Sequence, residues 1–372
     1  MMEFLLFSVI LLGFWYPGSV FLLDRGLKKA YRISRKSASV SGLHVSVIAA
    51  LRNEENNIDG LIDTLTGQDY PLYEVILVDD NSEDETFSKA EKRIKGLTNF
   101  KLIKAGENIH GWGPKKNAID WGIKQSQGEI ILTTDADCRP GKHWISGLLK
   151  HFSDDTAAVA GYSPLIFQDS VTGRLKSLEA LASGILSAAF IGLGKPFTAA
   201  GRNFAYRKDI YLKLGGFGRK GKAPAGDDDL LLQEIGKKYR TVFAFDEDSF
   251  VPSYPDGGGY IGRKRRHFSA AKRYPPLFII MGILLYIMLF IIILNLCYGI
   301  YTGKAEFLTA AAVISLLKIS ADYYFLRRGG NLLCESFKLH DFMLAELIQY
   351  PYTLILQPLS FLGGFKWMGR RL

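Results

Sequence analysis

Apolar residues are concentrated at the two ends of this chain, whereas the middle alternates between apolar and polar positions. Residues 4–23 contain no charged side chain, and a helix of about 20 apolar residues crosses the hydrocarbon core of a bilayer. The first residues are not basic, and a basic cluster follows the apolar run instead of preceding it. The pattern therefore favours an N-terminal transmembrane anchor over residues 1–24, with its N-terminus outside, and a cleaved signal peptide is the alternative.

Three more apolar stretches lie near the C-terminus, over residues 276–301, 307–326 and 342–364. The first is the clearest span, whereas charged residues interrupt the second and prolines interrupt the third. Three full crossings would place the basic C-terminal tail outside, against the preference of Lys and Arg for the cytoplasmic side. We therefore expect transmembrane or interfacial helices over residues 275–365, one of them re-entrant or interfacial.

Between residues 44 and 255, short β-rich runs alternate with segments of helical periodicity. The expected strands cover residues 44–51, 73–78, 100–104 and 130–134, and the expected helices cover residues 56–66, 87–94 and 115–125. Such alternation is typical of a mostly parallel sheet with helices on both faces. We predict a Rossmann-like α/β domain within residues 40–274.

One longer apolar helix is expected over residues 172–193. It either belongs to the core or lies in the membrane interface, and the basic side chains of Arg174 and Lys176 at its start favour the interface.

Acidic side chains follow two of the expected strands. Asp79 and Asp80 end the second strand, and Asp135 and Asp137 follow the fourth. Ligands bind at the carboxyl ends of parallel strands, and alternate residues can aim two carboxylates at one point. Because Mg²⁺ and Mn²⁺ accept carboxylate and phosphate oxygens, the Asp-Ala-Asp sequence predicts a site for one of these cations and a diphosphate; a solvated loop is the alternative.

Lys and Arg outnumber Asp and Glu, which gives the chain a net charge of +9. Many of these basic residues lie beside the apolar segments. One cluster lies within residues 25–36 and the other within residues 263–273. Both positions suit anionic lipid head groups, and the positive-inside rule places the α/β domain in the cytoplasm. We therefore expect a multi-pass protein of the inner or plasma membrane. Nucleic-acid binding would fit the charge alone, but no nucleic-acid motif supports it. Three cysteines without a Cys-x-x-Cys pair suit a reducing compartment.

Several spaced motifs together resemble the family 2 glycosyltransferases, which have the GT-A fold of nucleotide-diphospho-sugar transferases. These motifs are ALRNEEN (50–56), VDDNSEDET (78–86), GPKKNAI (113–119), TTDADC (133–138), GRNFAYRKD (201–209), GDDDLLL (226–232) and RKRRH (263–267). The resemblance covers residues 44 to about 270, and the flanking apolar segments are similar to those of membrane-bound members.

The resemblance implies a role for individual residues on the side of the nucleotide sugar. The residues expected to line the nucleotide pocket are Ala49, Leu51, Asn53 and Glu55. Asp79 is expected to accept a hydrogen bond from uracil, since a carboxylate suits a ring N–H, whereas Asp80 and Ser82 are expected to be turn or cap residues. Lys115 or Lys116 should lie near the phosphates of the sugar donor. The residues expected to contact its ribose and the metal are Asp135 and Asp137.

On the acceptor side, Asn203 is expected to help shape the sugar pocket, and Asp227-Asp228-Asp229 forms the candidate catalytic cluster. We assign Asp228 as the general base and Asp227 as its neighbour, because the reaction needs a carboxylate to take the proton of the acceptor hydroxyl. Clustered like charges raise the pKa of one member, which helps a base. The alternative is that these residues cap a helix over residues 230–238.

The sequence RKRRH resembles the Gln-x-x-Arg-Trp motif of membrane-bound members. Arg263 takes the Gln position, Arg266 the Arg position and His267 the Trp position. Arg266 could pair with the diphosphate through two hydrogen bonds, and a lipid-binding basic patch is the alternative. Since processive synthases use that Trp to pack against the growing polymer, His267 favours transfer of single sugars.

The sequence thus predicts an inverting, metal-dependent hexosyltransferase that uses a nucleotide sugar, UDP-linked in our interpretation. Its expected acceptor is a hydroxyl of a lipid or lipid-linked glycan at the membrane. One alternative is a nucleotidyltransferase that makes the nucleotide sugar, although residues 51–54 lack the Gly-rich basic loop such an enzyme needs. The other is a non-catalytic glycan-binding membrane subunit.

Overall fold

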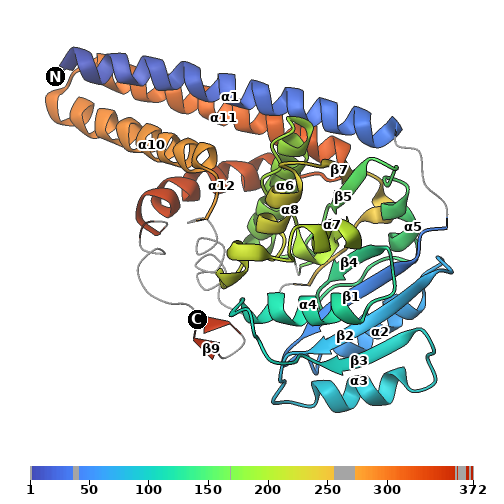
Figure 1. The fold of residues 1–372 in the computed structure, drawn as a ribbon. Coiled ribbons are helices and arrows are strands. Elements are labelled where there is room, and N and C mark those ends of the chain that lie inside the picture. The colour runs from blue at the N-terminus through green and yellow to red at the C-terminus, as the bar shows by residue number, and fades with distance from the viewer. Residues whose placement is uncertain are drawn as a thin grey trace.

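The structure is a computed structural model that describes residues 2–36, 42–167, 169–254, 273–356, 358, 366–367 and 370–371. It consists of an α/β domain and a layer of long helices that extends beyond one side of it (Figure 1). The longest helices in that layer, α1, α10 and α11, lie side by side.

The first half of the α/β domain alternates strands and helices as the sequence predicts. Its strands are β1 (Val45–Leu51), β2 (Tyr73–Asp79), β3 (Phe100–Lys104) and β4 (Ile130–Thr134), and its helices are α2 (Ile58–Thr66), α3 (Thr86–Ile94) and α4 (Pro114–Gln125). All four strands pair in parallel, with β1 between β2 and β4. The carboxyl ends of β2, β1 and β4 therefore lie together at one edge of the sheet.

The second half adds three strands, one of them antiparallel. These are β5 (Thr156–Gly161), β6 (Phe204–Arg207) and β7 (Arg240–Ala244). The strand order is β3-β2-β1-β4-β6-β5-β7, and β6 runs antiparallel to both β4 and β5. The prediction of an α/β domain with a mostly parallel sheet is confirmed.

Short helices connect this half of the sheet. They are α5 (Trp144–Leu149), α7 (Lys208–Lys213) and α8 (Asp229–Ile235), with 3₁₀ turns at Gly201–Asn203, Gly218–Lys222 and Glu247–Ser249. The turn at Gly201–Asn203 enters β6, and α8 begins inside the acidic cluster, so both meet at the edge that carries the other acidic residues.

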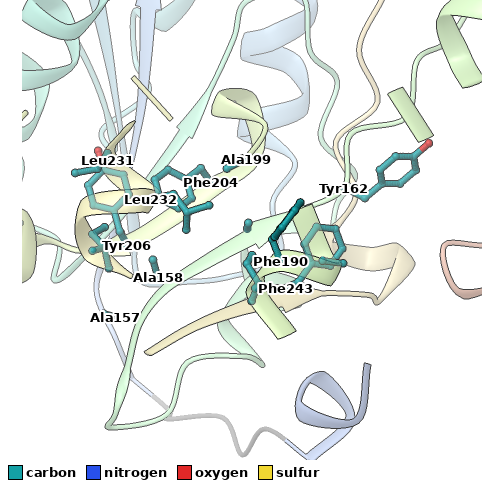
Figure 2. Close-up of a cluster of buried hydrophobic side chains, with 14 of the residues drawn as sticks. Ala157, Ala158, Tyr162, Phe190, Ala199, Phe204, Tyr206, Leu231, Leu232 and Phe243 are labelled. Carbon is teal, nitrogen blue, oxygen red and sulfur yellow. The ribbon is translucent and has the colours of Figure 1, made fainter. Parts of the chain in front are cut away.

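Two apolar cores lie on opposite faces of the sheet. One includes α2, α5 and alternate residues of β1, such as Val47 and Ala49. The other lies under α4, α6 and α8, and Figure 2 shows part of it, with Phe190, Phe204, Tyr206 and Phe243 among its side chains. Because successive residues of a strand point to opposite faces, strands buried on both faces read as continuous apolar runs.

Helix α1 (Met2–Lys36) is one continuous helix that passes through the predicted end of the anchor at residue 24. Its second half packs on α6 (Val171–Gly192). The two backbones come so close that a side chain at Gly192 would collide with the carbonyl oxygen of Gly26. Small residues permit this kind of approach between helices. The basic cluster after the apolar run is therefore part of a helix that also covers the α/β domain.

The residues of α6 that face the sheet are fully or nearly buried, including Leu181, Ile185 and Ala188. Half of its most apolar 18-residue stretch is buried inside the protein. Of the two interpretations for residues 172–193, the structure favours the core helix over the interfacial one.

The C-terminal helices are α10 (Pro276–Thr302), α11 (Ala305–Leu332) and α12 (Leu339–Pro351), followed by a π-helical turn at Tyr352–Leu356 and the two-residue strands β8 (Lys366–Trp367) and β9 (Arg370–Arg371). Within the described residues, α6 and α10 are long and apolar enough to span a bilayer. Only 17% of the most apolar 18-residue stretch of α10 is buried inside the protein. Lys318 on α11, in contrast, is fully buried between Asp322 and Glu346. The membrane helices at both ends stay predictions.

Candidate active site

The loops after β1 and β2 are bound to each other at the carboxyl edge of the sheet. Asn53, in the left-handed region with a φ of 52°, accepts the amide of Glu83 through its side chain. Glu55 likewise accepts the amide of Glu85. Arg52 binds the carbonyls of Asp80 and Asn81. The two loops thus form one rigid wall.

Asp79 ends β2 within this wall and is 2% exposed. Its carboxylate accepts the amide of Ser82 at 3.3 Å. Ser82 accepts the amide of Asn53, so it is a turn residue as expected, but it does not cap α3, whose N-cap position is Glu85. The role of Asp79 toward uracil stays a prediction.

Ala49 and Leu51 are placed differently from the expectation. Both side chains are fully buried in the core between β1 and α2. Ala50, which points to the other face, is the partly exposed residue at the end of β1. Because alternate residues of a strand share a face, Ala49 and Leu51 cannot line the pocket with their side chains; they support it from below.

Asp135 and Asp137 follow β4 and are both partly exposed, whereas Ala136 and Cys138 between and after them are buried. The amide of Cys138 donates to the carbonyl of Asp135, so the segment is a turn from which both carboxylates reach the surface. The backbone carbonyl of Asp137 accepts the amide of Tyr254, and this bond ties the segment to the chain after β7.

Lys115, on the first turn of α4, connects the two halves of the site. Its ammonium lies 2.8 Å from a carboxylate oxygen of Asp135 and 3.1 Å from one of Asp227. Burial lowers the pKa of Lys115, but these two carboxylates raise it by more, so its pKa lies above the ordinary value. The side chain is a permanent cation between the Asp-Ala-Asp segment and the acidic cluster.

The acidic cluster forms the start of α8, and Asp228 is held by two backbone amides. The amide of Gly201 donates to Oδ2 of Asp228, and the amide of Asp229 donates to Oδ1, both at 2.7 Å. A side chain at Gly201 would come within 2.8 Å of that Oδ2. Only glycine at this position lets the 3₁₀ turn approach the carboxylate so closely.

The members of the cluster differ in pKa because they differ in neighbours. Burial, together with the charges of Asp229 and Asp227, raises the pKa of Asp228 to about 8. Burial acts in the same direction on Asp227, but the adjacent Lys115 outweighs it and keeps the pKa of Asp227 below its usual range. A carboxyl with a pKa near neutrality is suited to general base catalysis, so the geometry favours Asp228 for that role. Asp228 also occupies the N-cap position of α8, so the capping alternative describes the same residue.

Lys116 does not lie at the phosphate site that the sequence suggested for it. It is 1% exposed, and its ammonium donates to the carbonyls of Ala223 and Ala225 at 2.8 and 2.7 Å. Burial lowers its pKa to about 8. Lys116 fixes the segment that leads into the acidic cluster, and it has no free path to a ligand.

We expect Lys116→Met to lower the free energy of unfolding by about 1–3 kcal/mol, because two buried carbonyls lose their donor. Thermal unfolding of the purified protein measures this, with the exposed Lys142→Met as the matched control. Equal stability of the two variants would contradict the structural role.

Asn203, expected to help shape the sugar pocket, is instead bonded inside the protein. It is fully buried, its amide nitrogen donates to the carbonyls of Tyr162 and Ser249, and its oxygen accepts from the indole of Trp144. With these bonds made inside the protein, it cannot contact a sugar. It anchors the turn that presents Gly201.

The last three residues singled out from the sequence, Arg263, Arg266 and His267, lie outside the described residues. Sequence reasoning missed Gly201 and the role of Asp229 described below, although Gly201 opens the quoted GRNFAYRKD motif and Asp229 belongs to the quoted cluster.

The described residues contain no group of three or more His, Cys, Asp or Glu side chains that could hold a metal by themselves. Mg²⁺ and Mn²⁺ sites in nucleotide-binding proteins often need only one or two carboxylates, because substrate phosphates supply the other ligands. Asp135 and Asp137, which are both partly exposed, fit that arrangement. Both residues stay candidate ligands: one oxygen of Asp135 lies 2.8 Å from the ammonium of Lys115, and Oδ1 of Asp137 accepts from the thiol of Cys138.

Comparison with known proteins matches residues 46–215 to the family described as Glycosyl transferase family 2. The chain is 33% identical over 103 residues to glycosyltransferase AglE of Haloferax volcanii, covering 27% of this chain and 33% of that protein. It is 24% identical over 245 residues to poly-beta-1,6-N-acetyl-D-glucosamine synthase of Staphylococcus aureus, covering 64% of this chain and 56% of that protein. The chain thus spans about a third to a half of the length of these curated relatives.

Among solved structures, a mannosyltransferase from Pyrobaculum calidifontis in complex with GDP-Man and Mn²⁺ covers 96% of both chains at 19% identity, with a TM-score of 0.49. The α/β architecture and the mostly parallel mixed sheet agree with the GT-A fold expected of the matched family.

Proposed function

We propose that this chain, whose residues 46–215 match glycosyl transferase family 2, transfers a sugar from a nucleotide sugar to a hydroxyl acceptor. The observation that carries the proposal is the bridge of Lys115 between Asp135 and Asp227. It joins the Asp-Ala-Asp segment after β4 to the acidic cluster on α8. A diphosphate leaving group and an attacking hydroxyl would therefore have complementary groups at one edge of the sheet.

The reaction is one direct displacement. Asp228 takes the proton of the acceptor hydroxyl as its oxygen forms a bond to the anomeric carbon, and the bond from that carbon to the diphosphate oxygen breaks on the opposite side. The anomeric configuration inverts. Lys115 places its charge where the nucleoside diphosphate departs, and preorganised charges of this kind lower the barrier. A divalent cation on Asp137, with Asp135 as the second candidate, would neutralise the diphosphate.

Asn53, Glu55 and Asp79 form the wall on which the base and ribose would lie, since they are ordered at the carboxyl ends of β1 and β2. UDP is our preferred nucleotide because a carboxylate at Asp79 can accept the ring N–H of uracil. Titrating UDP and GDP into the protein, with and without Mn²⁺, tests this proposal. Tighter, Mn²⁺-dependent binding of UDP supports it, whereas no nucleotide binding would favour the non-catalytic glycan-binding subunit.

The acceptor we propose is a lipid or lipid-linked glycan. Helix α10, the most exposed apolar helix of the described residues, begins beside the acidic cluster, and a bilayer around it would bring lipid-linked hydroxyls to Asp228. Transfer of single sugars, a cytoplasmic α/β domain and a multi-pass membrane location are part of the same proposal. A nucleotidyltransferase would instead release pyrophosphate, and the products of the reaction distinguish the two.

The pH dependence of transfer should follow Asp228. A general base must be deprotonated, and burial among like charges raises the pKa of Asp228 to about 8. We expect kcat/KM to rise with pH and to level off above a midpoint near that value. A pH–rate profile in overlapping buffers at saturating Mn²⁺ measures it; a rate that stays constant from pH 6 to pH 9 would contradict the assignment.

A further inference from the structure

The start of α10 is bound to the acidic cluster through Asp229. Tyr274, two residues before α10, donates its hydroxyl to Oδ2 of Asp229. The other oxygen of Asp229 accepts the hydroxyl of Thr198 at 2.7 Å and the amide of Ala199 at 3.0 Å. Asp229 is only 5% exposed. Both of its carboxylate oxygens are therefore used to hold two segments that are distant in sequence.

Aromatic rings reinforce the same junction. Phe278, in the first turn of α10, stacks on Phe197 with ring centroids 4.1 Å apart, and Tyr274 meets the edge of that ring at 5.1 Å. The carbonyl of Phe197 accepts from Gln233 on α8. The segment from Phe197 to Ala199 is thus held between α8 and the start of α10.

This segment leads directly to the amide that holds the general base. Gly201, two residues after Ala199, donates to Oδ2 of Asp228 at 2.7 Å. A shift of the segment would move that amide away from Asp228, which in turn would release the carboxylate from the orientation that the two amides impose.

We propose that Asp229 and Tyr274 are positioning residues that couple the docking of α10 to the orientation of Asp228. The proposal rests on the proposed function, since it concerns the general base of that reaction. When α10 leaves the cluster, Asp229 loses the hydroxyl of Tyr274, the segment around Ala199 loosens, and Asp228 is no longer aimed. The position of α10 thereby determines the orientation of the Asp228 carboxylate.

The coupling also has an electrostatic signature. The titratable groups that act on Asp228 are Asp227 and Asp229 on the same helix start, Lys115 and Lys116 from α4, and the neutral hydroxyl of Tyr274. Burial raises the pKa of Asp229, and the Tyr274 hydrogen bond opposes that effect. Without the bond, Asp229 holds its proton to higher pH and repels the anion of Asp228 less, so the pKa of Asp228 falls.

The test compares Tyr274→Phe and Asp229→Asn in the full-length, detergent- or nanodisc-embedded protein, with Tyr301→Phe as control, because Tyr301 lies on α10 and is 88% exposed. We expect kcat to fall about tenfold or more for both variants, with KM for the sugar donor unchanged. The acidic limb of the pH profile should move to lower pH in both, and Tyr301→Phe should match the wild type.

Wild-type kcat and pH profile in Tyr274→Phe would overturn the inference, and so would a fall in kcat without a shift of the pH midpoint, which a merely structural role would give. Should Asp229→Asn fail to fold, Tyr274→Phe decides alone, since it removes one hydroxyl and keeps the ring packing. The proposed function fails separately, if the wild-type protein turns over no nucleotide sugar at all.

Discussion

Replacing Asp228 by Asn should lower kcat/KM for sugar transfer by about 10²–10⁴-fold, the range that a general base contributes. Asn has nearly the same shape as Asp but cannot take the proton of the acceptor hydroxyl. Binding of the nucleotide should remain, because the predicted nucleotide wall at Asn53 and Asp79 does not include Asp228. Release of nucleoside diphosphate at sugar donor concentrations below KM, measured with a coupled assay, gives the ratio of the kcat/KM values.

The control for Asp228→Asn is Asp154→Asn, which makes the same change at an exposed residue. Unfolding of both variants must be followed, because Asn keeps an oxygen that can cap α8 but places an NH₂ group opposite one of the two backbone amides that donate to Asp228, and the lost hydrogen bond costs about 1 kcal/mol. A variant that is destabilised by that amount but keeps wild-type turnover would show that Asp228 is a structural residue and not the base.

Replacing Asp137 by Asn should abolish the effect of Mn²⁺ on nucleotide binding. The variant removes the carboxylate we assign as the metal ligand, so the loss should exceed the ~10–100-fold in metal affinity that removal of an outer partner costs. Calorimetric titration of UDP with Mn²⁺ and with EDTA measures the difference. Asp135→Asn, which changes the second candidate ligand, is compared in the same titration.

Unchanged Mn²⁺ dependence in Asp137→Asn, with normal folding, would place the cation elsewhere. Binding of UDP that is independent of Mn²⁺ in the wild type would remove the metal from the account altogether, and would leave Lys115 as the group at the diphosphate.

The first four strands and their helices could be predicted from the sequence because their signal is local. Each is a short apolar run followed by helical periodicity, and β1 to β4 pair in parallel without insertions. The later strands gave no such signal. β6 has four residues and pairs antiparallel between β4 and β5, so its place depends on partners far away in the sequence.

The same distinction explains the outcome at the site. Asp135 and Asp137 could be found because they follow a recognisable strand. The roles of Lys116 and Asn203 could not, since they depend on carbonyls at Ala223, Ala225, Tyr162 and Ser249 that only the folded chain brings close. Adjacent lysines in one motif thus have opposite roles: Lys115 faces the acidic residues, and Lys116 is bound inside the protein.

Helix α1 combines a predicted membrane anchor with a segment that packs on the α/β domain. From the sequence, its apolar half predicts a membrane span, and its basic half contains Leu27 and Ala30, which are buried against the α/β domain. The positive charges could be read from the sequence, whereas the close approach of Gly26 and Gly192 depends on the three-dimensional packing of α1 on α6.

The most direct test of the central claim is turnover of a panel of UDP- and GDP-sugars by the purified full-length protein with Mn²⁺, for the wild type, Asp228→Asn and Asp154→Asn. We expect wild-type protein and Asp154→Asn to release nucleoside diphosphate from at least one sugar donor, and Asp228→Asn to release it about 10²–10⁴-fold more slowly. Release of nucleoside diphosphate by Asp228→Asn at the wild-type rate would contradict the account.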